Sequence, residues 1–110
     1  MLNKVQLIGR LGQDPEVKEI KGGDKMTTLN IATSEYYRDG DERKEVTDWH
    51  RVVCFRQTAE FAGKHLTKGR LVYVEGKIKT RQYEENGQTK YITEIRALSI
   101  LPLDPKNKKD

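Results

Sequence analysis

Apolar and polar residues alternate along several short stretches of this chain, which is the pattern of strands with one buried face. In the first stretch, residues 4–11, apolar residues occupy every second position. Asp14-Pro15 ends or bends this strand, and we expect residues 16–20 to continue it. The same alternation predicts further strands at residues 26–34, 47–55, 71–83 and 89–101.

Turn residues and one helical segment separate these stretches. Asn86-Gly87 is the strongest hairpin-turn signal in the chain. Residues 58–66 place apolar side chains at helical spacing, so we expect a helix there. Five strands with a single helix between strands 3 and 4 is the order of an OB-fold. We therefore predict an all-β protein, an OB-fold built as a five-stranded Greek-key barrel.

The composition limits what such a domain can do. The 110 residues are 35% hydrophobic and 35% charged, which predicts one domain with a small core at residues 1–103 and a flexible basic tail at residues 104–110. A net charge of +4 with a pI near 9.2 permits nucleic-acid binding without demanding it. The single Cys54 excludes an internal disulfide, and no metal-ligand spacing is present, so we expect no metal and no cofactor. Without a signal peptide or a membrane-length apolar run, we expect a cytoplasmic protein with no membrane partner.

The strand at residues 47–55 carries the most informative chemistry. Alternation puts Trp49, Arg51 and Phe55 on one face, with His50 on the other. Two aromatic rings with a cation between them suit a surface that stacks the bases of single-stranded nucleic acid. The alternative is that the two rings are core residues, as most aromatic residues are.

The strand at residues 71–83 repeats this chemistry. Lys77, Lys79 and Arg81 share a face with Tyr83. Taken alone, a row of cations is most often an ordinary solvated surface. Two strands with the same combination of cations and aromatic rings favour a nucleic-acid interface instead.

At this point the sequence resembles the bacterial single-stranded-DNA-binding proteins (SSB) over nearly all of residues 1–101. The resemblance rests on several blocks in the same order: Asn3-Lys4-Val5, Leu11-Gly12-Gln13-Asp14-Pro15-Glu16-Val17, Ala32-Thr33-Ser34-Glu35, Trp49-His50-Arg51-Val52-Val53, Val74-Glu75-Gly76 and Thr80-Arg81. It implies a homotetramer that binds single-stranded DNA with little sequence specificity. Such a protein protects the strand during replication, recombination and repair, on the bacterial nucleoid, and catalyses no reaction.

The resemblance also assigns roles to residues. Base-stacking positions of the family match four aromatic residues: Tyr37, Trp49, Phe55 and Tyr83. Positions that contact the DNA backbone match five cations: Lys4, Arg51, Lys68, Lys79 and Arg81. His50 matches a subunit-contact position. Tyr36 must point away from Tyr37 on a strand, so we expect only one of the two to stack.

Two other functions stay open at the level of sequence. Many SSBs recruit replication and repair enzymes through an acidic C-terminal tip, whereas this chain ends in Lys106-Asn107-Lys108-Lys109-Asp110, which makes such recruitment doubtful. A related OB-fold accessory, such as a dimeric primosomal protein, is therefore the first alternative. A metal-dependent nuclease is the second alternative, because four carboxylates cluster in one loop: Asp39, Asp41, Glu42 and Glu45. Three cations, Arg38, Arg43 and Lys44, interleave with them and indicate a solvated loop instead.

Overall fold

The computed structural model describes residues 1–105, so the predicted flexible tail lies, from residue 106 on, outside the described residues. The elements are β1 (Val5–Leu11), β2 (Glu16–Glu19), the short 3₁₀ helix η1 (Lys21–Gly23), β3 (Lys25–Asp39), β4 (Glu42–Phe55), α1 (Arg56–His65), β5 (Leu71–Glu85) and β6 (Gln88–Pro102). No helix in this part of the chain is long and apolar enough to cross a membrane.

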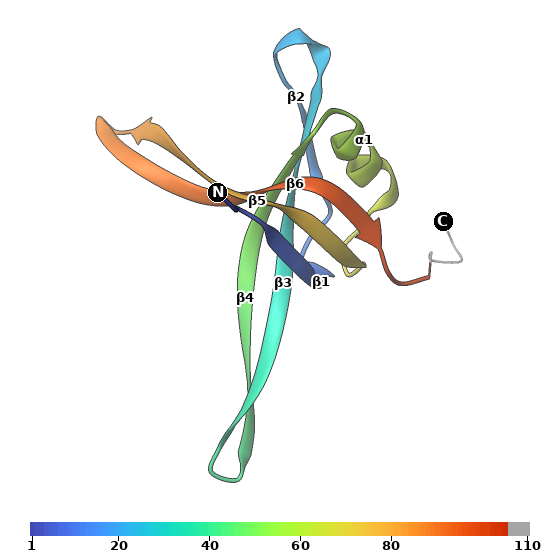
Figure 1. Ribbon diagram of the computed structural model, residues 1–110, viewed down its shortest axis with the longest axis vertical. Helices are drawn as coiled ribbons and strands as arrows, with labels where there is room; N and C mark the ends of the chain where they lie inside the picture. The colour runs from blue at the N-terminus through green and yellow to red at the C-terminus, as the bar shows by residue number, and fades with distance from the viewer. Residues whose placement is uncertain (106–110) are drawn as a thin grey trace.

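Five of the strands close into a barrel in the order β1-β5-β6-β4-β3, and a pairing between β1 and β3 completes the circle (Figure 1). The neighbouring strands are antiparallel except β4 and β6, which are parallel. The predicted all-β OB-fold barrel with one helix is confirmed.

The helix follows the strand at residues 47–55 as predicted, but one more strand precedes it than the sequence analysis counted. α1 lies between the fourth and fifth strands of the chain, not between strands 3 and 4. The reason is that β2 is a strand of its own, paired with β3, and not a continuation of β1. Pro15 has no N–H to donate to a ladder, so the chain leaves one pairing and enters another around this residue.

The barrel interior is filled by the residues that alternation predicts. Leu29 and Ile31 of β3, Val52 of β4 and Val72 and Val74 of β5 are completely buried, and each contributes about 1.5–3 kcal/mol by leaving water. The helix α1 covers one end of this core with small and apolar side chains, Ala59, Ala62 and, just after its end, Leu66.

Polar groups inside the core are satisfied locally. The buried Thr27 hydroxyl donates to the carbonyl oxygen of Ala59 at 2.8 Å, which ties β3 to α1. Cys54 packs beside it, and burial raises the pKa of its thiol to about 12. Cys54 therefore acts as a neutral packing residue.

Two long hairpins extend away from the barrel in different directions (Figure 1). We call them the β3–β4 arm, residues 34–49, and the β5–β6 arm, residues 77–91; every residue in both is exposed. The β5–β6 arm turns at Asn86-Gly87, as predicted, with φ of 54° and 77°, the two left-handed residues of a type I′ turn. The β3–β4 arm is longer than predicted, because β3 continues five residues beyond Ser34.

The described chain stays attached to the barrel as far as Asp104. The guanidinium group of Arg70 donates to the Asp104 carboxylate at 2.7 Å, and the backbone N–H of Leu71 donates to its other oxygen at 3.2 Å. These contacts lower the pKa of Asp104, with the Arg70 hydrogen bond as the largest cause. These contacts hold the chain against the start of β5 as far as Asp104.

Candidate nucleic-acid interface

Trp49 lies on the outside of the barrel, at the root of the β3–β4 arm. Its side chain is exposed by 61%, which rules out the alternative that it is a core residue. The ring rests against the turn after β1, where a Cβ on Gly12 would come within 2.3 Å of the Trp49 Cζ3 atom. Only glycine leaves room for the ring there, so the backbone supports Trp49 from below and leaves the rest of the indole open to a ligand.

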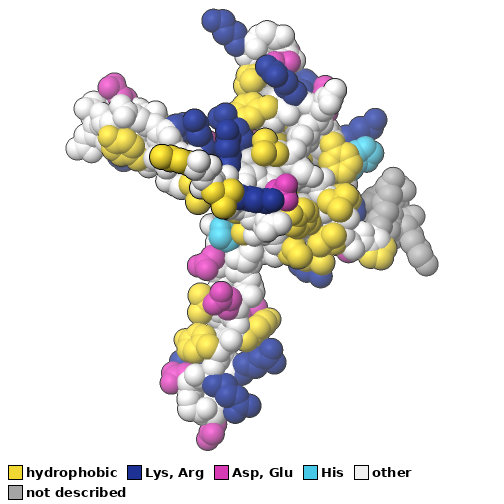
Figure 2. All heavy atoms as spheres, viewed as in Figure 1, with side chains coloured by type: hydrophobic (Ala, Val, Ile, Leu, Met, Phe, Trp, Pro, Cys, Tyr) yellow, Lys and Arg dark blue, Asp and Glu magenta, His cyan; other side chains and the backbone are white. Residues whose placement is uncertain are grey.

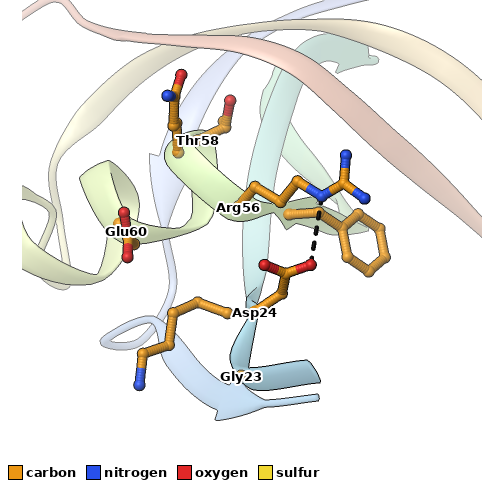
Figure 3. A pocket seen from close by; sticks show the side chains of 8 residues that line it. Gly23, Asp24, Arg56, Thr58 and Glu60 are labelled. Carbon is orange, nitrogen blue, oxygen red and sulfur yellow. Dashed lines mark hydrogen bonds and ion pairs between the residues drawn. The ribbon is translucent and has the colours of Figure 1, made fainter. Parts of the chain in front are cut away.

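Phe55 ends β4 on the same side as Trp49 and is less open. It is half-buried, and the guanidinium carbon of Arg96 lies 4.8 Å from the centre of its ring. A polar hollow of about 420 Å³ begins beside Phe55, between η1 and the start of α1. Figure 3 shows that an ion pair of 3.4 Å between Arg56 and Asp24 borders this hollow. Arg96 therefore covers one face of the Phe55 ring, and a stacked base needs the other face or the displacement of Arg96.

Tyr36 and Tyr37 lie on opposite faces of the β3–β4 arm. Tyr36 pairs with Glu45, which shares a face of β4 with Thr47 and Trp49. The Tyr36 side chain already has two partners. The guanidinium carbon of Arg43 lies 4.3 Å from the centre of its ring. The Glu45 carboxylate accepts from its hydroxyl group, which raises the pKa of Tyr36.

Tyr37 pairs with Lys44 and faces the other side of the arm. Its ring is exposed, and among residues 1–105 no side-chain hydrogen bond or cation contact involves it. The structure thus separates Tyr37 from Trp49 by face while leaving both rings open.

The cations predicted on β5 do share a face. Lys77, Lys79 and Arg81 alternate along the strand and end at Tyr83, which is partly exposed. The pairing with β6 adds Arg96 opposite Lys77 and Lys90 opposite Tyr83. Figure 2 shows a dense group of Lys and Arg side chains where the β5–β6 arm leaves the barrel. This face is the most strongly basic surface among the predicted site residues.

One buried carboxylate lies within this basic face. Glu94 of β6 sits opposite Lys79, and its side chain is only 4% exposed. Its two oxygens accept from the Nε atoms of Arg51, at 3.0 Å, and Arg81, at 2.9 Å. Both predicted phosphate-binding arginines, one from β4 and one from β5, are therefore brought together by a residue that the sequence analysis missed.

The position of Glu94 beside the cations of β5 was predictable from the hairpin turn. The two-residue turn at Asn86-Gly87 fixes the register of the hairpin, and that register puts Glu94 directly across from Lys79. Sequence reasoning also missed Tyr91, which is highly exposed on the opposite face of the arm, across from Gln82.

The remaining predicted cations lie elsewhere on the barrel. Lys4 precedes β1, and its ammonium group lies 3.6 Å from the carboxylate of Glu75. Lys68 lies in the loop after α1, where its backbone N–H donates to an Asp14 carboxylate oxygen at 2.8 Å. The structure thus gathers Arg51, Lys79 and Arg81 into one surface and leaves Lys4 and Lys68 apart from it.

His50, the predicted subunit-contact residue, is half-buried on the other face of β4 from Trp49. Its Nε2 atom lies 2.8 Å from the hydroxyl oxygen of Thr33. Together with Val5, Leu7 and Ile78 it borders an open hollow of about 330 Å³ that also holds Trp49, Arg51 and Glu94. His50 therefore lies at the apolar side of a hollow whose other side belongs to the basic face.

Both the sequence and the fold of this chain match known proteins. The model of the single-strand binding protein family matches residues 2–103. A Plasmodium falciparum SSB in complex with ssDNA is similar, with 43% identity and a TM-score of 0.85 over 94% of this chain and 97% of that chain.

Two structures of the Thermus aquaticus single-stranded DNA binding protein, the wild type and a deletion mutant, are 38% identical to this chain, with TM-scores of 0.80 and 0.81. They match over 94% of this chain but only 50% and 51% of their own, so the chain spans about half of their length. The family resemblance predicted from sequence is confirmed: this chain belongs to the single-strand binding protein family.

Proposed function

We propose that this protein binds single-stranded DNA with little sequence specificity and protects it during replication, recombination and repair. The observation that carries the proposal is the position of the exposed Trp49 beside the face that holds Arg51, Lys79 and Arg81. A flat ring next to several cations can stack a base and hold the phosphate that follows it. Family membership and the ssDNA complex of the Plasmodium falciparum SSB support the same function.

The mechanism is stacking on aromatic rings combined with attraction of phosphates. We assign the stacking to Trp49, Phe55, Tyr37 and Tyr83, and the phosphate contacts to Arg51, Lys79 and Arg81, with Lys4 and Lys68 further along the path. Every base presents a π-face, and every nucleotide carries the same phosphate, so neither contact reads the sequence. Binding of this kind needs no catalysis, and we propose none.

We further propose that the protein is a homotetramer with two-fold symmetry. A row of three side chains crosses the outer face of the barrel, because Ile8 pairs with Tyr73 and Tyr73 with Leu101. Ile8 and Leu101 are both more than half exposed. An apolar row of this kind on a folded domain favours burial against another copy. By family resemblance we assign His50 to the subunit contact. We also propose that the protein works in the cytoplasm, on the bacterial nucleoid, and family membership supports this proposal.

One titration tests this proposal against both alternatives. Long oligo-dT is added to the protein while mass and Trp49 emission are recorded together. We expect a particle of four times the 12.7 kDa chain mass before DNA is added, and tight binding that duplex DNA of equal length does not match. A stable dimer would favour the primosomal type of accessory, and a stable monomer at micromolar concentration would contradict the proposed assembly.

The nuclease alternative is tested in the same samples. Its carboxylates lie near the tip of the β3–β4 arm, where Asp39 and Glu42 both pair with Lys44, at 3.2 and 3.9 Å. These pairs indicate a solvated turn. Cleavage of the oligo-dT on addition of Mg²⁺ or Mn²⁺ would support the nuclease instead.

A further inference from the structure

We propose that Glu94 is a positioning residue for phosphate binding: it holds Arg51 and Arg81 side by side so that their terminal nitrogens face the DNA. This inference rests on the proposed function. Glu94 comes from β6, and the arginines come from β4 and β5, so one carboxylate joins three strands of the barrel wall.

The contacts leave each arginine free to bind a phosphate. Both guanidinium groups donate to Glu94 through Nε, one to each carboxylate oxygen. Within the part of the chain that the structure describes, no other side-chain hydrogen bond involves either group. The terminal nitrogens, which form the fork that grips a phosphate, therefore remain available.

Burial explains why the arrangement is rigid. The Glu94 side chain is 4% exposed, whereas those of Arg51 and Arg81 are 37% and 47% exposed. A carboxylate taken out of water is costly unless it is paired, so Glu94 holds both partners firmly. The inner end of each guanidinium is fixed and the outer end reaches solvent, which is the geometry of a group arranged before its ligand arrives.

Simple attraction between charges predicts the opposite role for Glu94. A carboxylate in a surface that binds phosphates repels them, so its removal should strengthen DNA binding. If Glu94 acts by positioning, its removal should weaken binding even though the surface becomes more positive. The sign of the effect therefore separates the two explanations.

Glu94→Gln is the informative substitution because it changes the charge and keeps the shape. The amide has one oxygen that can accept and one NH₂ group that cannot, so only one of the two arginines keeps its partner. Glu84→Gln is the matched control: Glu84 is exposed on the neighbouring β5–β6 arm, pairs with Thr89, and its replacement adds the same charge.

The experiment measures the affinity of variants of this whole 110-residue chain for oligo-dT over a range of salt concentrations. For Glu94→Gln we expect affinity to fall about fivefold or more, and the log–log salt slope to become shallower by about 0.7, one phosphate contact. For Glu84→Gln we expect equal or slightly tighter binding. Glu94→Gln binding as tightly as Glu84→Gln, with an unchanged or steeper slope, would overturn the inference.

A second variant keeps the test decisive if Glu94→Gln does not fold, which a thermal melt would show. Arg81→Lys keeps the charge and can still pair with Glu94, but it has no second nitrogen left for a phosphate. We expect it to lose affinity and salt slope, and wild-type behaviour of Arg81→Lys would overturn the inference. Failure of the unmodified protein to bind oligo-dT would refute the proposed function itself, which is a different result from any of these.

Discussion

The two arms that leave the barrel have similar backbones and opposite charge. The β3–β4 arm, residues 34–49, carries six carboxylates against three lysines and arginines, whereas the β5–β6 arm, residues 77–91, carries two against four. Figure 2 shows acidic and basic side chains mixed along the β3–β4 arm and a basic group at the root of the other. The β3–β4 arm nevertheless holds three exposed aromatic residues, Tyr36, Tyr37 and Trp49.

This difference indicates a division of labour. Phosphates should be drawn to the β5–β6 arm and repelled by the β3–β4 arm, so we propose that the aromatic residues of the β3–β4 arm contact bases and add little to charge attraction. Apart from Tyr83, which we assign to stacking on the β5–β6 arm itself, the stacking rings of the β3–β4 arm and the phosphate-binding cations can then be altered one at a time. Each of the following substitutions tests that separation.

Trp49→Ala should have the largest effect. Loss of one stacking ring costs on the order of 1–3 kcal/mol of binding free energy per base, and the salt slope should not change because no charge is removed. The thermal melting temperature should stay close to that of the wild type, since Trp49 lies outside the core. A clear change in salt slope would show that the two arms do not divide the work in this way.

Lys77→Ala combined with Lys79→Ala should show the reverse signature. The log–log salt slope for oligo-dT binding should become shallower by about 1.4, two contacts at 0.7 each, and affinity should fall equally for all DNA sequences. Neither lysine forms an ion pair with another of residues 1–105, so the barrel should keep its stability. If the double variant instead changes sequence preference, the β5–β6 arm reads bases.

Tyr37→Ala should weaken binding more than Tyr36→Ala. The ring of Tyr37 is open, whereas Arg43 and Glu45 already occupy Tyr36. Competitive titration of the two variants against one labelled oligo-dT measures the difference directly. The opposite order would mean that DNA follows the Trp49 face of the arm and displaces Arg43 from the ring.

Asp41→Asn combined with Glu42→Gln should have the smallest effect, and in the favourable direction. Removing two carboxylates at the exposed tip of the acidic arm should tighten binding about twofold at low salt, and the gain should vanish as salt screens it. Affinity measured at low and high salt checks this expectation. A loss of affinity would place these side chains in contact with DNA.

The sequence predicted the barrel better than the arms, for a physical reason. A barrel strand has one buried face, so apolar residues recur at every second position, as in β1 and in the first half of β3. The arms are exposed on both faces and carry no such pattern, which is why β3 was expected to end at Ser34 and continues to Asp39. The turn at Asn86-Gly87 was predictable because its backbone has a local chemical requirement.

The site was predictable where single strands determine it and not where several strands meet. Alternation alone put Trp49, Arg51 and Phe55 on one face and Lys79, Arg81 and Tyr83 on another. The role of Glu94 depends on a parallel pairing between β4 and β6 that no local pattern announces. From the sequence alone, Glu94 is expected to be a surface residue, because its partner Arg51 comes from a different strand.

The most direct test of the account uses the emission of Trp49, the only tryptophan in the chain. The unmodified protein is titrated with oligo-dT and, separately, with duplex DNA of equal length, while binding is followed independently by mass. If Trp49 stacks bases, oligo-dT should quench its emission strongly and duplex DNA far less. Tight binding of oligo-dT that leaves the emission unchanged would contradict the account, because the bases would then lie away from Trp49.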